Sequence, residues 1–72
     1  MLIALNRIMT TGERRRILVN PETINYMEDR VHGYGSIVYA LMGTMHVAET
    51  TQQIKDKVSA ATLNNQQKHG DA

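Results

Sequence analysis

The only proline of this 72-residue chain constrains its fold more than any other residue, and it lies in the stretch ILVNPETINYMED. Proline has no amide hydrogen for a β-ladder, and its ring forces the preceding residue into an extended conformation. Pro21 therefore ends a strand predicted over 16–19 and forms a turn with Asn20. The residues 22–29 that follow suit either a second strand or a short helix that begins at the proline. We favour the strand, because Thr, Ile and Tyr prefer pleated surfaces.

Alternating apolar residues between turns predict three further strands, over 2–9, 36–42 and 45–49. In the first of them, Arg7 interrupts one apolar face and Asn6 interrupts the other. Gly12 and four consecutive charged residues predict a turn over 10–16. Gly43 and Thr44 separate the last two strands, a spacing that predicts a β-hairpin.

A single helix is predicted over about 51–62. Thr50 and Gln53 have the spacing of a capping box, and Ile54, Val58 and Ala61 recur on one helical face. The residues 63–72 are polar and predict a flexible tail. The predicted fold class is α+β, mainly β: one domain over 1–62, with a small antiparallel sheet or partly closed barrel and one C-terminal helix.

The composition favours self-association. The chain has no Cys, Phe or Trp, so its core is built from Ile, Leu, Val and five Met without disulfides or thiolate metal sites. Ordering costs about 1.5 kcal/mol per residue, which a domain of this size barely offsets by burial. The apolar opening MLIALNRIM is too short for a membrane span, so we expect a cytoplasmic protein without membrane insertion.

A set of motif residues carries a family resemblance. Asn20-Pro21 ends a strand, a hydrophobic residue and an acid follow at Ile24 and Glu28, and a V-x-E segment enters the helix. The matching positions in that last segment are Val47, Glu49, Thr50, Ile54 and Val58. Over residues 2–58 the chain resembles the small bacterial FlbD-like family, which is associated with flagellar and motility genes. It differs from that family at DRVHGYGS, where the family has a shorter turn.

The resemblance implies a fold and a context without an enzymatic activity. Similar short reading frames also occur in phage and prophage. The expected function is therefore a non-enzymatic protein-interaction module that self-associates and binds a protein partner, either as a motility accessory or as a phage-encoded regulator or inhibitor.

The strand over 36–42 is apolar on both faces, as expected of a strand at an interface. Methionine side chains repack readily against different partners. We therefore predict a homo-oligomer and protein-partner interface formed by Val38, Ala40, Met42 and Met45.

An alternative function is that of a small barrel-like nucleic-acid binder. Its contacts would come from Arg14, Arg15, Arg16 and Tyr34. The competing interpretation places the three arginines in a solvated turn and the tyrosines of the chain, Tyr26, Tyr34 and Tyr39, in the core as its only large side chains.

No catalytic, metal or cofactor site is predicted. The three histidines lack the spacing of a metal site, and no H-E-x-x-H motif or glycine-rich phosphate loop is present in the sequence. We expect Glu49 to complement the N-terminal end of the helix dipole.

Overall fold

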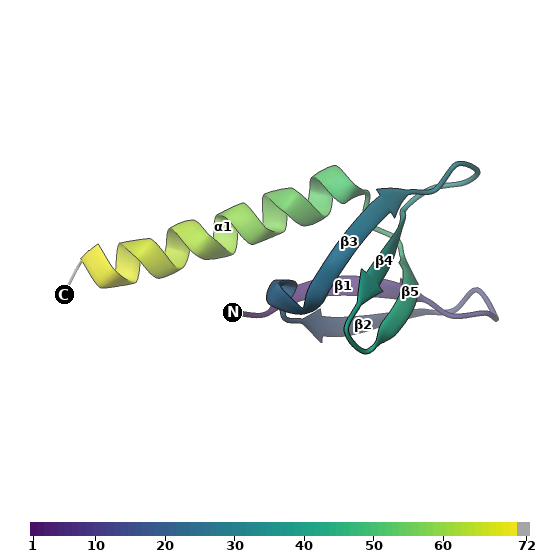
Figure 1. Cartoon of the computed structure of the whole chain (residues 1–72), viewed down its shortest axis with the longest axis horizontal. Coiled ribbons are helices and arrows are strands. Elements are labelled where there is room, and N and C mark those ends of the chain that lie inside the picture. The colour runs from purple at the N-terminus through teal and green to yellow at the C-terminus, as the bar shows by residue number, and fades with distance from the viewer. Residues whose placement is uncertain (71–72) are drawn as a thin grey trace.

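The computed structural model describes the backbone of residues 1–70 and the side chains of residues 1–63. Five strands form one antiparallel sheet, and one helix follows them, so the predicted α+β, mainly β class is confirmed. The elements are β1 (Ile3–Ile8), β2 (Arg14–Val19), the 3-10 turn η1 (Pro21–Thr23), β3 (Ile24–Asp29), β4 (Ser36–Ala40), β5 (Gly43–Val47) and α1 (Thr51–Gly70). Figure 1 shows α1 crossing one side of the sheet and continuing past it, which makes the molecule 46 Å long and 20 Å wide.

The sheet has the order β2-β1-β5-β4-β3 and is open, so the barrel alternative does not apply. The hairpin β1–β2 and the meander β3–β4–β5 are each joined by antiparallel ladders of five or six register pairs, with one register shift between Ile24 and Tyr26. One register pair, Arg7 with Val47, connects β1 to β5. The fold therefore consists of two locally paired halves that meet along a very short seam (Figure 1).

Residues 22–29 begin in a helical turn and continue as a strand, so each of the two interpretations is correct for part of this segment. Pro21–Thr23 form one 3-10 turn, in which the Asn20 side chain accepts a hydrogen bond of 3.0 Å from the Glu22 amide. The Thr23 amide and hydroxyl both donate to the Asn20 carbonyl, at 3.0 Å and 2.7 Å. These bonds close a single turn, after which β3 begins at Ile24 as a strand. The proline thus turns the chain from one half of the sheet to the other.

Two predicted turns are wrong in position. β2 begins at Arg14, so the three arginines lie in a strand and the turn ends before them. The hairpin turn between β4 and β5 is formed by Leu41 and Met42, and Gly43 is already the first residue of β5. Gly43 has a φ of +133°, a value that other residues rarely adopt, so glycine is the residue that suits this first position of β5.

The capping box that was predicted for α1 is confirmed. The Gln53 amide donates to the Thr50 hydroxyl at 3.2 Å, and the Thr50 amide donates to the Gln53 side chain at 2.9 Å. The helix is longer than predicted: its backbone continues past 62 and ends at Gly70. The prediction of a flexible tail extends to residues 71 and 72, which lie outside the described residues.

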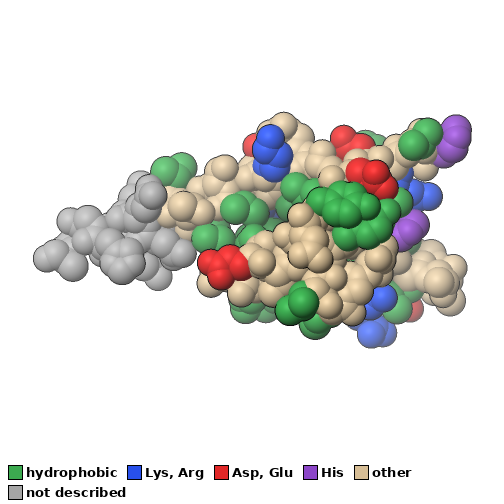
Figure 2. All heavy atoms as spheres, in the orientation of Figure 1, with side chains coloured by type: hydrophobic (Ala, Val, Ile, Leu, Met, Phe, Trp, Pro, Cys, Tyr) green, Lys and Arg blue, Asp and Glu red, His purple; other side chains and the backbone are tan. Residues whose placement is uncertain are grey.

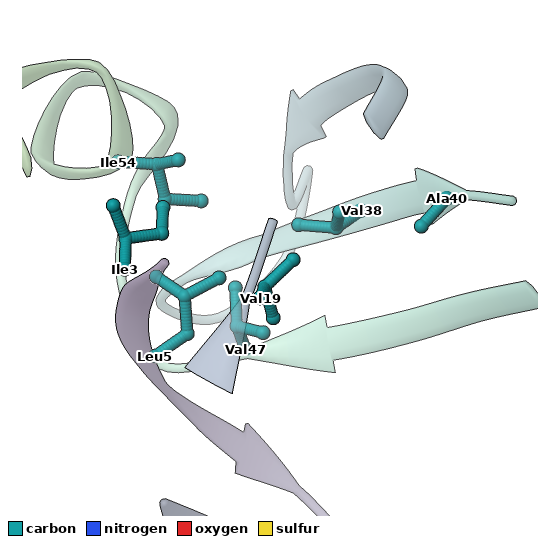
Figure 3. Packing of buried hydrophobic residues seen from close by; sticks show 7 residues of the cluster. All are labelled: Ile3, Leu5, Val19, Val38, Ala40, Val47 and Ile54. Carbon is teal, nitrogen blue, oxygen red and sulfur yellow. The ribbon is translucent and has the colours of Figure 1, made fainter. Parts of the chain in front are cut away.

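The core lies between the two halves of the sheet and the first turns of α1 (Figure 3). Figure 3 shows Ile54 of α1 beside Ile3 of β1. Leu5, Val38, Val47 and Ile54 have no solvent exposure. Among residues 1–63, the buried apolar residues are Ile3, Leu5, Val19, Val38, Ala40, Val47 and Ile54. These are small aliphatic side chains, as the composition requires, and no tyrosine is among them.

Candidate functional site

The predicted interface residues do not form one surface. Val38 is fully buried and Ala40 is 8% exposed, so both belong to the core and neither can contact a partner in this fold. Met42 is 81% exposed at the β4–β5 turn, and Met45 is half-buried on β5. The interface predicted for these four residues is therefore wrong for Val38 and Ala40.

The register of the meander explains this outcome. Directly opposed residues on adjacent strands share a face, and faces alternate along each strand. Met27, Val38 and Met45 form one such row and point into the core. The next row, Tyr26, Tyr39 and Thr44, therefore lies on the outer face, together with the row Glu28, Ile37 and His46.

We call this outer surface of β3, β4 and β5 the tyrosine face. The rings of Tyr26 and Tyr39 stack with centroids 4.2 Å apart and planes 13° from parallel. Figure 2 shows the resulting hydrophobic patch over β3 and β4. Tyr26 is 56% exposed, so the prediction that the tyrosines fill the core is wrong. The absence of Phe and Trp suggested that role, but strand alternation places Met27 and Val38 inside instead.

Tyr39 is tied to a carboxylate on the same face. Its hydroxyl donates a hydrogen bond of 3.0 Å to Glu28. This bond stabilises the neutral phenol and, with a smaller contribution from Tyr26, raises the pKa of Tyr39 to about 12. The tyrosine face is thus apolar at its centre and carries one acid at its rim.

The three arginines of β2 point to different faces. The hairpin register pairs Arg14 with Ile8, Arg15 with Arg7 and Arg16 with Asn6. Arg15 therefore shares a face with Arg7, whereas Arg14 and Arg16 lie on the opposite face. The structure does not bring the three predicted nucleic-acid contacts of β2 onto one surface.

The segment from Val47 to Thr51 is attached to three strands, and we call it the junction. The Glu49 carboxylate, 8% exposed, accepts from the Asn6 amide at 3.0 Å and from the Asn6 side chain at 2.9 Å. The Ser36 hydroxyl donates to the Glu49 carbonyl at 2.9 Å, and the Thr51 amide donates to Asp29 at 2.9 Å. The Glu49 carboxylate thus contacts β1, its role at the helix dipole stays a prediction, and Asp29 accepts from the first helical amide.

A hollow of about 370 Å³ lies beside the junction and contains an acid, so we call it the acidic hollow. Arg14 and Tyr34, two of the predicted nucleic-acid contacts, lie in its wall, and Tyr34 is 69% exposed. The lining residues are Asn6, Arg14, Tyr34, Ala48, Glu49, Gln53 and Lys57. Part of the predicted nucleic-acid set therefore converges at this hollow.

A second hollow, of about 480 Å³, lies on the other side of the Arg7–Val47 pair, and we call it the wedge. Its lining residues come from the end of β1, the loop after it, β5 and the loop after β3: Arg7, Ile8, Met9, Thr10, Gly12, Arg30, Thr44, Met45 and His46. This grouping was not predicted from the sequence. A signal was present, because Arg7 interrupts an otherwise apolar face of β1.

The described residues contain no group of three or more His, Cys, Asp or Glu side chains placed to hold a metal ion. Within the same part of the chain, no helix has the length and apolarity needed to cross a membrane.

Comparison of the chain with protein-family models, curated proteins and solved structures found no match. The FlbD-like resemblance therefore rests on its motif residues and stays a prediction. Function has to be argued from the surfaces described above.

Proposed function

We propose that the protein is a non-enzymatic interaction module that pairs with a second copy of itself through β3. The observation that carries this proposal is the position of β3: it is an edge strand of an open sheet and borders the tyrosine face. An edge strand presents unpaired amide and carbonyl groups, which pair readily with another strand.

The two edges of the sheet differ in how they are protected. β2 carries Arg14, Arg15 and Arg16, and charged residues on an edge discourage pairing with another chain. β3 has acids only at its end, where Asp29 is already bonded to Thr51. A register shift between Ile24 and Tyr26 disturbs the beginning of β3. The regular segment from Tyr26 to Glu28 is therefore the part suited to pairing.

This segment is complementary to itself. An antiparallel pair of β3 strands, related by a two-fold axis at Met27, sets Tyr26 of each copy opposite Glu28 of the other. No like charges then oppose each other across the new ladder. The paired sheet joins the two tyrosine faces into one continuous surface, which supports the oligomer predicted from the composition.

The proposal is tested by sedimentation equilibrium of the full chain at concentrations up to about 1 mM. We expect a monomer–dimer equilibrium in the wild-type protein. Tyr26→Glu places two carboxylates opposite each other at two symmetric positions, and should weaken the dimer at least about tenfold. Combining it with Glu28→Lys restores opposite charges and should recover most of the affinity.

The matched control is Tyr34→Glu, which adds the same charge at an exposed loop position away from β3. It should leave the dimer affinity within about twofold. A wild-type protein that stays monomeric, or an equal loss from both substitutions, would exclude pairing through β3. The predicted protein partner, in motility or in a phage context, stays a prediction.

The acidic hollow favours one second candidate, nucleic-acid binding. Arg14, Tyr34 and Lys57 share its wall and supply cations beside an exposed ring. Glu49 in the same wall, and the location of Arg15 on the other face, oppose it. Fluorescence anisotropy with a labelled single-stranded oligonucleotide tests this candidate. Binding through phosphate contacts should weaken steeply as the salt concentration rises, and Arg14→Gln should weaken it further.

A further inference from the structure

We infer that the wedge is a binding site for a small phosphate-type oxyanion. The wedge exists because β1 and β5 share the single pair Arg7–Val47 and then separate. Its walls are the residues from Arg7 to Gly12 on one side and from Thr44 to His46 on the other. Its volume of about 480 Å³ lies in the range of small-molecule sites.

Three basic residues from separate elements are among the residues that line the wedge. Arg7 comes from β1, Arg30 from the loop after β3, and His46 from β5. No Asp or Glu is among the lining residues, whereas the acidic hollow contains Glu49. The hairpin register also sets Arg15 directly opposite Arg7, and like charges in that position are destabilising. A bound anion would relieve this repulsion.

Three acids of β3 and the junction are engaged elsewhere. Asp29, next to Arg30 in the sequence, accepts from the Thr51 amide. Glu49 accepts from Asn6, and Glu28 accepts from Tyr39. Each of these bonds fastens the fold or the tyrosine face. These carboxylates are therefore committed to other partners, which favours a ligand from outside the chain for the cations of the wedge.

The backbone of Arg30 is held by a hydrogen bond before any ligand arrives. Arg30 is half-buried, and its amide donates to the Gly35 carbonyl at 3.1 Å. Its guanidinium lies over Gly33, where a Cβ added to the glycine would be 3.6 Å from the guanidinium carbon. A guanidinium in this position can present its planar set of donors to an oxyanion.

The remaining lining residues indicate the kind of anion. They include Thr10 and Thr44, which carry hydroxyl groups, and the apolar residues Ile8, Met9 and Met45. Two guanidinium groups match a diphosphate better than a single carboxylate, because each can bind phosphate oxygens in a bidentate manner. The site therefore suits a compact phosphate ester or diphosphate.

The test is isothermal titration calorimetry of the full chain with sodium pyrophosphate at low salt. We expect saturable binding of one pyrophosphate per chain. Arg30→Gln should weaken it at least about tenfold, and Arg7→Gln should do the same independently. The matched control is Lys55→Gln, which removes one positive charge from an exposed position of α1 outside both hollows and should change the affinity less than about twofold.

A single-stranded oligonucleotide is the competing probe. If pyrophosphate displaces the oligonucleotide and Arg30→Gln weakens the binding of both ligands equally, the wedge binds phosphate groups. The ratio of the two affinities then shows whether a free diphosphate or a nucleic-acid phosphate is the preferred ligand. Binding that Lys55→Gln weakens as much as Arg30→Gln does would show diffuse attraction to net charge and overturn the proposal. Absence of saturable pyrophosphate binding would overturn it as well. Both outcomes are independent of the oligomeric state measured above.

Discussion

The two sides of the Arg7–Val47 pair are built in opposite ways. On the side of the junction, Glu49, Ser36 and Asp29 supply hydrogen bonds that attach the end of β5 and the start of α1 to three strands. On the side of the wedge, the strands separate and the charged residues are all basic. The difference teaches how a chain of almost neutral net charge divides its charges: acids hold the junction together, and the cations of the wedge remain available for binding.

The largest effect is expected where the junction is most tightly packed. Gly35 has a φ of +96°, and a Cβ there would overlap the carbonyl oxygen of Val47. Gly35→Ala should lower the free energy of unfolding by about 3 kcal/mol, from backbone strain plus the steric overlap. Urea denaturation followed by circular dichroism measures the change.

The control for this substitution is Gly33→Ala. Gly33 has a similar φ of +92°, but a Cβ there meets only the Arg30 side chain at an ordinary contact distance. The cost should be limited to the strain of about 1–2 kcal/mol. Equal losses from the two substitutions would show that backbone conformation alone, and not the tight contact with Val47, limits the junction.

The next effect concerns the acid of the junction. Glu49→Gln keeps the shape of the side chain, but it sets an amide donor against the Asn6 amide group and removes the charge. We expect a loss of about 2 kcal/mol in the free energy of unfolding. Glu22→Gln, at an exposed position in η1 where no side-chain bond of Glu22 is lost, should change it by less than about 0.5 kcal/mol. A similar small change at Glu49 would mean that the junction depends on packing more than on this carboxylate.

A smaller effect of the opposite sign is expected at the wedge. Arg15→Gln removes the like charge opposite Arg7 and should stabilise the fold by about 0.2–1 kcal/mol in low salt. Arg16→Gln is the matched control, since Arg16 lies on the other face opposite the neutral Asn6. The difference between the two variants should shrink as salt screens the repulsion. A difference that is independent of salt would argue against charge repulsion at the wedge.

The last prediction uses a carboxylate outside both regions. The pKa of Tyr39 is raised to about 12 by its hydrogen bond to Glu28 and, to a smaller extent, by Tyr26. The neutral phenol therefore stabilises the fold fully below pH 10, and this contribution is lost as the pH rises through about 12. Glu28→Gln should lower the pKa of Tyr39, as measured by the ultraviolet absorbance of tyrosinate, with Tyr39→Phe assigning the transition. An unchanged pKa would show that Glu28 is not its main cause.

The parts of the structure that depend on local sequence were predictable. The capping box of Thr50 and Gln53, the five strands and the turn at Pro21 follow from residues within a few positions of one another. The position of the β4–β5 turn was wrong because Leu41 and Met42 continue the apolar alternation of β4 without a break. Apolarity alone does not show where a hairpin turns.

The candidate site was not predictable in the same way, because non-local register creates it. Arg7, Arg30 and His46 lie far apart in the sequence, and the one seam pair between β1 and β5 groups them. The interruptions of β1 were nevertheless informative. Asn6 contacts Glu49 and Arg7 lines the wedge, so both residues that broke an apolar face mark a position where the strand does more than fill the core.

The short seam between the two halves also bears on how the chain reaches its native state. The hairpin and the meander each need only nearby residues, and such units form within about 1–10 µs. The contact from Asn6 to Glu49 instead closes a loop of 43 positions. The conformational entropy of this loop is lost before the other bonds between the two halves can compensate for it. We therefore expect docking of two preformed halves to limit the refolding rate, with the junction as the last region to form and the first to open.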